Sequence, residues 1–188
     1  MLAPGASANR DHTGLVAIDQ AATVAGFTVR RIDFPYRLAG RRAPDRPAVL
    51  VSTVVREAGS LAAEGGIAPE EIFLGGRSMG GRICSMAVAG GMPAAGLVLV
   101  SYPLHPPGRP DRLRTEHFRS LNLPCLFVSG TSDAFAAPAE LEAALAAVPG
   151  KVTVRWLEGG DHGLRGREDE AAAIVAAWLA SQLHGPVQ

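Results

Sequence analysis

Short apolar runs alternate along this chain with longer stretches in which apolar residues recur every three or four positions. The short runs are rich in Val, Leu, Ile and Phe, and Gly or Pro bounds most of them, which favours β-strands over helices. In the first run, Phe27, Val29 and Ile32 are interspersed with arginines, as in a strand with one polar side. The predicted strands are residues 27–34, 71–75, 96–101, 124–130 and 151–157.

The longer stretches show the 3.6-residue period of amphipathic helices. Within residues 13–25, the apolar residues Leu15, Ile18, Ala22 and Val24 fall roughly on one face. A second stretch has Pro47 shortly after Asp45, a combination typical of a helix cap and first turn. The predicted helices are residues 13–25, 47–63, 79–90, 137–147 and 168–183.

Repeated strand–helix units predict a mostly parallel, doubly wound α/β sheet with helices on both faces. The composition agrees, because 47% hydrophobic residues with only 5% aromatics suit parallel strands between layers of helices. The chain has 188 residues, the length of one domain, and no linker or repeat divides it. We therefore expect a single domain over residues 1–188.

The charge balance argues against nucleic acid or an anionic membrane as a partner, because the formal net charge is zero. No apolar run reaches the roughly 20 residues that span a bilayer. Arg10 and Asp11 interrupt any signal-peptide core, so a cytoplasmic protein is expected. Cys84 and Cys125 are interpreted as reduced core thiols. The sequence has neither metal-ligand spacing nor a phosphate-binding glycine motif, so no cofactor is expected.

Residues 76–80, GRSMG, match the pattern G-x-S-x-G with Ser78 at its centre. The bare pattern is weak, but this copy directly follows the predicted strand 71–75 and precedes the predicted helix 79–90. A strand-to-helix turn is what a nucleophile elbow requires, and the flanking glycines let the backbone turn sharply. Ser78 is therefore the candidate nucleophile.

A serine hydroxyl attacks poorly unless a neutral imidazole takes its proton. Elbow enzymes place an acid and then the histidine after the serine in the chain. His162 and Asp133 each follow a predicted strand, at the sheet edge where α/β sites gather, so we expect them to be base and orienting acid. Asp161 is the rival acid, but it adjoins His162, and neighbouring side chains usually point apart. The other histidines are His12, His105, His117 and His184.

An acyl-transfer site also needs two N–H donors for the tetrahedral oxygen. The backbone N–H of Met79, directly after the nucleophile, is the expected first donor. The second should come from the Gly-containing loop at residues 2–7, where we expect Ala6, with Ser7 as the alternative. Ser7, Tyr102 and His105 are the residues expected to contact substrate.

Two further segments have more than one interpretation. The Pro-rich sequence PLHPPGRP could cover the pocket as a minimal cap, because proline stiffens a loop and no inserted lid domain is present. A basic stretch between Arg30 and Arg46 could attract an anionic acyl substrate, or it could be a solvated loop before a helix.

Taken together, LAPGAS, DFPYR, GGRSMGGR, SYPLHPPGRPDRLRTEH, SGTSDAF and GGDH resemble one family over essentially the whole chain. This family consists of predicted α/β-hydrolases and includes a subunit of the chromatin-acetylating NSL complex and a testis-expressed protein. Its nearest better-understood relatives are dienelactone-hydrolase-like enzymes. The resemblance implies an α/β-hydrolase fold and a Ser78–Asp133–His162 triad. The chain departs from the family in having PGAS where His-Gly-Ala-Gly is frequent. The family also has more residues before this loop, so N-terminal strands are expected to be missing or trimmed.

Two functions of different classes follow. The first is a carboxylesterase-like or thioesterase-like hydrolase that forms an acyl-enzyme on Ser78 with a small acyl substrate. The second is a weakly active or inactive interaction module, because fold alone does not fix function. The complete Ser, Asp and His set favours the enzyme.

Overall fold

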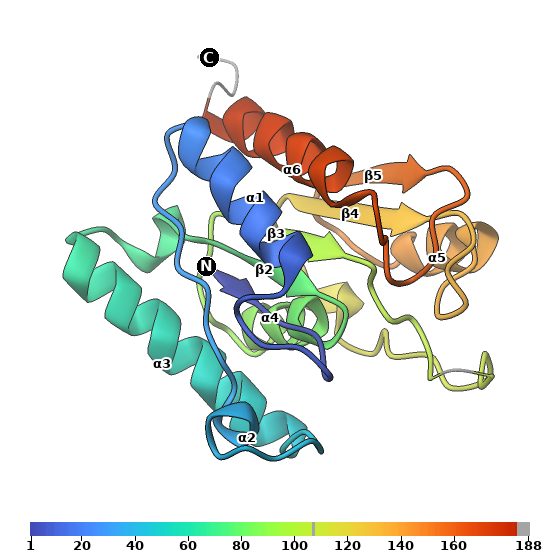
Figure 1. The fold of residues 1–188 in the computed structure, drawn as a ribbon, viewed down its shortest axis with the longest axis horizontal. Coiled ribbons are helices and arrows are strands. Elements are labelled where there is room, and N and C mark those ends of the chain that lie inside the picture. The colour runs from blue at the N-terminus through green and yellow to red at the C-terminus, as the bar shows by residue number, and fades with distance from the viewer. Residues whose placement is uncertain (107, 184–188) are drawn as a thin grey trace.

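A computed structural model describes residues 1–106 and 108–183; His184 and Pro107 lie outside the described residues. Its centre is a single sheet in which all paired strands are parallel and lie in chain order from β1 to β5 (Figure 1). The strands are β1 (Leu2–Ala3), β2 (Phe73–Arg77), β3 (Gly96–Val100), β4 (Cys125–Gly130) and β5 (Val152–Leu157).

Helices cover both faces of this sheet, as predicted (Figure 1). One face carries α1 (Thr13–Val24) and α6 (Glu168–Leu183), which lie side by side. The opposite face carries α3 (Pro47–Gly65), α4 (Met79–Ala89) and α5 (Pro138–Leu145). Three short turns complete the elements: α2 (Pro35–Leu38), η1 (Pro69–Glu71) and η2 (Phe118–Ser120).

The central strands are buried on both sides, which explains why they read as continuous apolar runs. Along β3, Leu97 and Leu99 point into the core beneath α3 and α4, whereas Val98 and Val100 point into the core beneath α1 and α6. The sheet is therefore a rigid layer between two cores, and its carboxyl edge holds the loops that follow the strands in fixed positions.

The predicted strand 27–34 was wrong. Only Arg31 forms a bridge, parallel to Leu2, on the side of β1 away from β2. The Leu2 N–H donates to the Arg30 carbonyl at 2.8 Å, and the Ile32 N–H donates to the Leu2 carbonyl at 3.0 Å. Pairing stops there because β1 has two residues, so the rest of the segment has no strand to bond with.

The chain reverses its direction across the sheet at β1. It first crosses to the Arg31 bridge on one side of β1 and then returns to form β2 on the other side. In open α/β sheets, ligands bind outside the carboxyl ends of the strands at such a switch point. The loop after β1 and the turn after β2 both lie there.

Candidate active site

Ser78 sits on a sharp turn between the end of β2 and the start of α4. Its backbone has φ 51° and ψ −120°, a strained conformation for a residue with a side chain. The Ser78 N–H donates to the Val100 carbonyl at 2.8 Å, which ties the turn to β3. Ser78 therefore lies on the strand-to-helix turn expected of a nucleophile elbow, and such backbone strain is typical of functional positions.

The loop after β1 lies directly against this turn. A Cβ built on Gly80 would lie 2.1 Å from the Ala3 carbonyl oxygen, so only glycine lets α4 start so close to β1. A Cβ built on Gly5 would lie 3.6 Å from the Ser78 Cβ. The loop that begins at Pro4 therefore forms one wall around the Ser78 side chain.

The structure brings His162 and Asp133 to Ser78. Nε2 of His162 lies 2.9 Å from Ser78 Oγ, and Nδ1 of His162 lies 2.8 Å from Asp133 Oδ2 and 3.0 Å from Oδ1. The Asp133 side chain is fully buried, whereas 18% of the His162 side chain is exposed. A buried carboxylate thus bonds one edge of an imidazole whose other nitrogen faces the hydroxyl, which is the geometry of a base-activated serine.

Asp161, the rival acid, is used locally. Its Oδ1 accepts a hydrogen bond from the Leu164 N–H at 2.8 Å and caps the turn after His162. Asp133 instead accepts the Phe135 N–H at 2.8 Å, a bond that fixes the carboxylate relative to its own loop. Of the two carboxylates, Asp133 is the one that contacts the imidazole.

Sequence reasoning missed two residues of this site. Phe135 stacks on the His162 ring, with centroids 4.0 Å apart and planes 24° apart. Arg77 Nη2 donates a hydrogen bond of 2.6 Å to the His162 carbonyl. Both lie inside motifs quoted from the sequence, but nothing in their spacing indicates a partner so distant along the chain.

The two expected oxyanion donors have free N–H groups in the described part of the chain. Met79 is the first residue of α4, where a backbone N–H has no partner within the helix. Ala6 lies in a turn closed by the Ala8 N–H and the Gly5 carbonyl, and its own carbonyl accepts the Tyr36 hydroxyl at 2.7 Å. Ser7, the alternative, lies in the same turn and is exposed. The turn is therefore anchored on the side away from solvent.

The other two expected substrate contacts are buried and bonded internally. The Tyr102 hydroxyl donates to the Arg114 carbonyl at 2.7 Å, and its ring is fully buried. Nδ1 of His105 donates to the Pro106 carbonyl at 2.9 Å, and its Nε2 lies 3.4 Å from Glu140 Oε2. Both side chains thus hold the loop after β3 in place, and the structure does not bring either of them into contact with Ser78 or His162.

A second Ser–His contact joins α4 to the start of η2. Ser85 Oγ is 2.7 Å from Nε2 of His117, where α4 meets the loop before η2. Burial, reinforced by the positive charge of Arg82, lowers the pKa of His117 from 6.5 to about 4. The imidazole is therefore neutral at physiological pH, and the contact ties the loop to the helix.

The basic stretch between Arg30 and Arg46 forms ion pairs at the surface, and such pairs contribute little to stability. These pairs agree with the interpretation of the stretch as a solvated segment before a helix. The pairs are Arg30–Glu64, Arg31–Asp19 and Arg41–Asp45.

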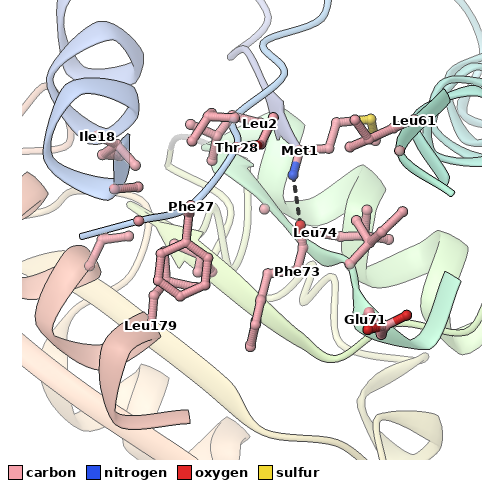
Figure 2. Close-up of a pocket in the computed structure, with 18 of the residues that line it drawn as sticks. Met1, Leu2, Ile18, Phe27, Thr28, Leu61, Glu71, Phe73, Leu74 and Leu179 are labelled. Carbon is pink, nitrogen blue, oxygen red and sulfur yellow. Dashed lines mark hydrogen bonds between the residues drawn. The ribbon is translucent and has the colours of Figure 1, made fainter. Parts of the chain in front are cut away.

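An apolar cavity of about 470 Å³ lies beside the start of β2 (Figure 2). Phe27, Phe73 and Leu179 surround it, next to the start of β2. Ser78 follows the other end of this 5-residue strand, at a rise of about 3.3 Å per residue. The cavity therefore lies near the amino end of β2, whereas Ser78 follows its carboxyl end, and we do not assign the cavity as an acyl pocket for that serine.

The comparison with protein families agrees with this geometry. A family model described as the alpha/beta hydrolase domain matches residues 1–180. This chain belongs to that family. Sheet, elbow and chain order thus place the protein in the α/β-hydrolase superfamily, and this confirms the predicted fold class.

Solved α/β-hydrolase structures share the fold at low sequence identity. An alpha-beta serine hydrolase homologue from Coxiella burnetii has a TM-score of 0.77 at 18% identity, covering 95% of this chain and 83% of that one. A monoacylglycerol lipase from Paleococcus ferrophilus has a TM-score of 0.73 at 18% identity, and the match covers 96% of this chain and 93% of the lipase. The esterase domain of a Rhodothermus marinus protein has a TM-score of 0.72 at 16% identity, and the match covers 96% of this chain and 85% of that domain. At these identities, the likeness establishes the fold alone.

Within residues 1–106 and 108–183, no three His, Cys, Asp or Glu side chains are grouped to hold a metal ion. In the same part of the chain, every helix is too short or too polar to cross a membrane. Cys84 and Cys125 are buried and free of disulfide bonds, and burial raises the pKa of each thiol to about 12.

Proposed function

We propose that this alpha/beta hydrolase cleaves an ester or thioester bond of a small acyl substrate through an acyl-enzyme on Ser78. The observation that carries the proposal is the position of His162, with Nε2 2.9 Å from Ser78 Oγ and Nδ1 2.8 Å from the buried Asp133. The chemistry uses only the chain's own residues. We further propose that the protein is related to the NSL-complex and dienelactone-hydrolase-like proteins that its motifs resemble. We also propose that it acts in the cytoplasm.

In the first step, the proton of the Ser78 hydroxyl passes to Nε2 of His162 while Oγ bonds to the substrate carbonyl carbon. The carbonyl π pair moves onto oxygen and gives a tetrahedral oxyanion. Asp133 accepts the Nδ1–H of the ring, so it selects the tautomer with a free Nε2 and stabilises the imidazolium that forms. The ring needs no reorientation because Asp133 and Phe135 already hold it.

The oxyanion would lie between the Met79 and Ala6 N–H groups. Both are free of internal acceptors in the described chain, and the contact between Gly5 and the Ser78 turn keeps their segments together. Met79 also opens α4, whose N-terminal dipole favours negative charge. Preorganised donors of this kind each contribute about 10²–10³ in kcat.

The intermediate collapses when the imidazolium returns its proton to the leaving oxygen or sulfur and the C–O or C–S bond breaks. Water then attacks the acyl-enzyme, giving one proton to His162 and its oxygen to the acyl carbon. The proton returns to Ser78 Oγ as the carboxylic acid leaves. The loop between β3 and η2 contains no helix or strand in its described part, so it forms at most a small cap over the site, and on this basis we propose short acyl groups.

A fluorophosphonate probe tests the proposal because it reacts only with an activated serine. Mass spectrometry should locate the adduct at Ser78, and short p-nitrophenyl esters and acyl thioesters should be hydrolysed. Ser78→Ala should abolish labelling and lower kcat by roughly 10⁴- to 10⁶-fold with the fold intact. If the folded wild-type protein neither takes up the probe nor cleaves any ester or thioester, it is an interaction module instead.

A further inference from the structure

The position of the Arg77 guanidinium, on the residue before Ser78, is not explained by a contribution to folding stability. It ends β2, and its partly buried side chain borders a small cavity with His12 and Glu168, where α1 and α6 begin. Helix N-termini carry positive partial charge, which opposes a cation there. Burial lowers the pKa of Arg77, and no carboxylate in the described chain forms an ion pair with its guanidinium.

Charge at a distance offsets part of this cost. Asp133 and Asp161 act on Arg77 electrostatically, in the direction that favours its charged form, while Arg165 opposes it. A partly buried cation without a contacting counter-ion is nevertheless an expensive choice, since an apolar side chain of similar volume is often neutral or stabilising. The hydrogen bond from Nη2 to the His162 carbonyl, at 2.6 Å, is the specific contact that Arg77 makes.

The loop that carries His162 starts far from the nucleophile strand in the sheet. It follows β5, and β3 and β4 lie between β5 and the nucleophile strand β2. Neighbouring strands are about 4.8 Å apart, so the loop must return across roughly 14 Å of sheet edge. In the described chain, two hydrogen bonds join His162 to the nucleophile side, one from Ser78 Oγ and one from Arg77.

We infer that Arg77 is a positioning residue that holds the His162 loop against the nucleophile turn through its bond to the His162 carbonyl. The inference rests on the proposed function, because the loop has to be held only if Nε2 must meet Ser78 Oγ. The Arg77 backbone lies in β2, where it is paired with Val100, so the guanidinium projects from a rigid strand. It acts through His162 and does not touch the reacting atoms.

The test compares Arg77→Met, which removes charge and donors, with Arg77→Lys, which keeps the charge. Arg167→Met is the matched control, because Arg167 also donates to a backbone carbonyl, that of Glu158 at 2.7 Å, but outside the site. Displacement of a reacting group by about 1 Å costs roughly 10²-fold in rate. Arg77→Met should therefore slow fluorophosphonate labelling of Ser78 about 10²-fold, while Arg77→Lys recovers part of the rate and Arg167→Met leaves it unchanged.

Two further measurements separate positioning from simple loss of structure. The melting temperature of Arg77→Met should stay within about 3 °C of wild type. Methylguanidinium added to Arg77→Ala should restore part of the labelling rate. Wild-type labelling in Arg77→Met, or failure of both Lys and methylguanidinium to restore any rate, would overturn the inference.

Proton NMR of the His162 Nδ1–H, which bonds to Asp133, decides the inference even if the proposed hydrolase activity fails. This resonance should be protected from exchange in the wild-type protein and broadened or lost in Arg77→Met. A resonance that is equally protected in both proteins would contradict the role of Arg77, and so would its absence from the wild type. Failure of the proposed function would appear separately, as a wild-type protein that takes up no probe.

Discussion

The ring of Phe135 lies against the imidazole of His162, with centroids 4.0 Å apart and planes 24° apart. The same residue donates its backbone N–H to Asp133, which in turn contacts His162. One loop after β4 therefore supplies both the carboxylate that bonds the imidazole edge and the aromatic ring that covers its face. Rotation of His162 about its side-chain torsions is restricted in two directions.

Phe135→Leu should lower kcat for ester hydrolysis about 10-fold, because the leucine fills space without offering a flat surface to the imidazole. Phe135→Tyr keeps the stacking face and should remain close to wild type. Steady-state kinetics on one p-nitrophenyl ester checks both variants. Equal rates for the Leu and Tyr variants would show that the stack does not orient His162.

Asp133→Asn should lose roughly 10⁴-fold in kcat, because the amide favours the wrong tautomer of His162. Asp161→Asn should retain much of the activity, since Asp161 bonds the Leu164 N–H and not the ring. The two variants differ from wild type by the same change of charge, so each controls for the other in a kinetic comparison. A larger loss in Asp161→Asn would reject the assignment of Asp133.

Gly80→Ala should destabilise the fold by about 1–3 kcal/mol, because the added methyl group would lie 2.1 Å from the Ala3 carbonyl oxygen. Gly59→Ala is the control: Gly59 is exposed within α3, and a Cβ there meets nothing within 4 Å. That change should stabilise the protein by about 0.5–1 kcal/mol. Urea unfolding followed by circular dichroism measures both, and equal midpoints would contradict the tight contact.

His117 should make the protein less stable as the pH falls from about 6.5 to about 4. Its pKa is lowered from 6.5 to about 4 in the folded protein, so between these values the unfolded chain binds a proton that the folded one does not. Above pH 6.5 both forms are neutral, and the contribution vanishes. Urea unfolding at several pH values should show a steeper decline for wild type than for His117→Gln. Parallel curves would count against a neutral, buried His117.

The sequence predicted most of the sheet because each central strand combines an apolar run with a Gly or Pro boundary. It failed at residues 27–34, where the alternation is real but the neighbouring β1 is too short to pair with it. The start of β2 was placed two residues early because Pro69–Glu71 form a 3₁₀ turn that the apolar Ile72 conceals. The apolar pattern of a segment therefore indicates that it can form a strand, but it does not show how long the neighbouring strand is.

At the candidate site, the sequence indicated Ser78, Asp133 and His162 because chain order and strand ends constrain such residues strongly. It could not indicate Arg77 or Phe135, whose contacts with His162 depend on how the end of β2 and the loops after β4 and β5 meet. Tyr102 and His105 are expected from the sequence to contact substrate, but whether such side chains point inward depends on packing. The structure shows both buried.

The candidate site joins segments that a ribosome makes at different times. Ser78 and His162 are 84 positions apart, which corresponds to about 4–17 s of synthesis at roughly 5–20 residues per second. Throughout that interval, the serine is already part of the growing chain but has no imidazole to take its proton. If Ser78 acts as proposed, its hydroxyl is inert in the nascent chain, and reactivity towards acyl groups begins only when the chain has been made as far as His162 and this segment has folded back over the sheet edge.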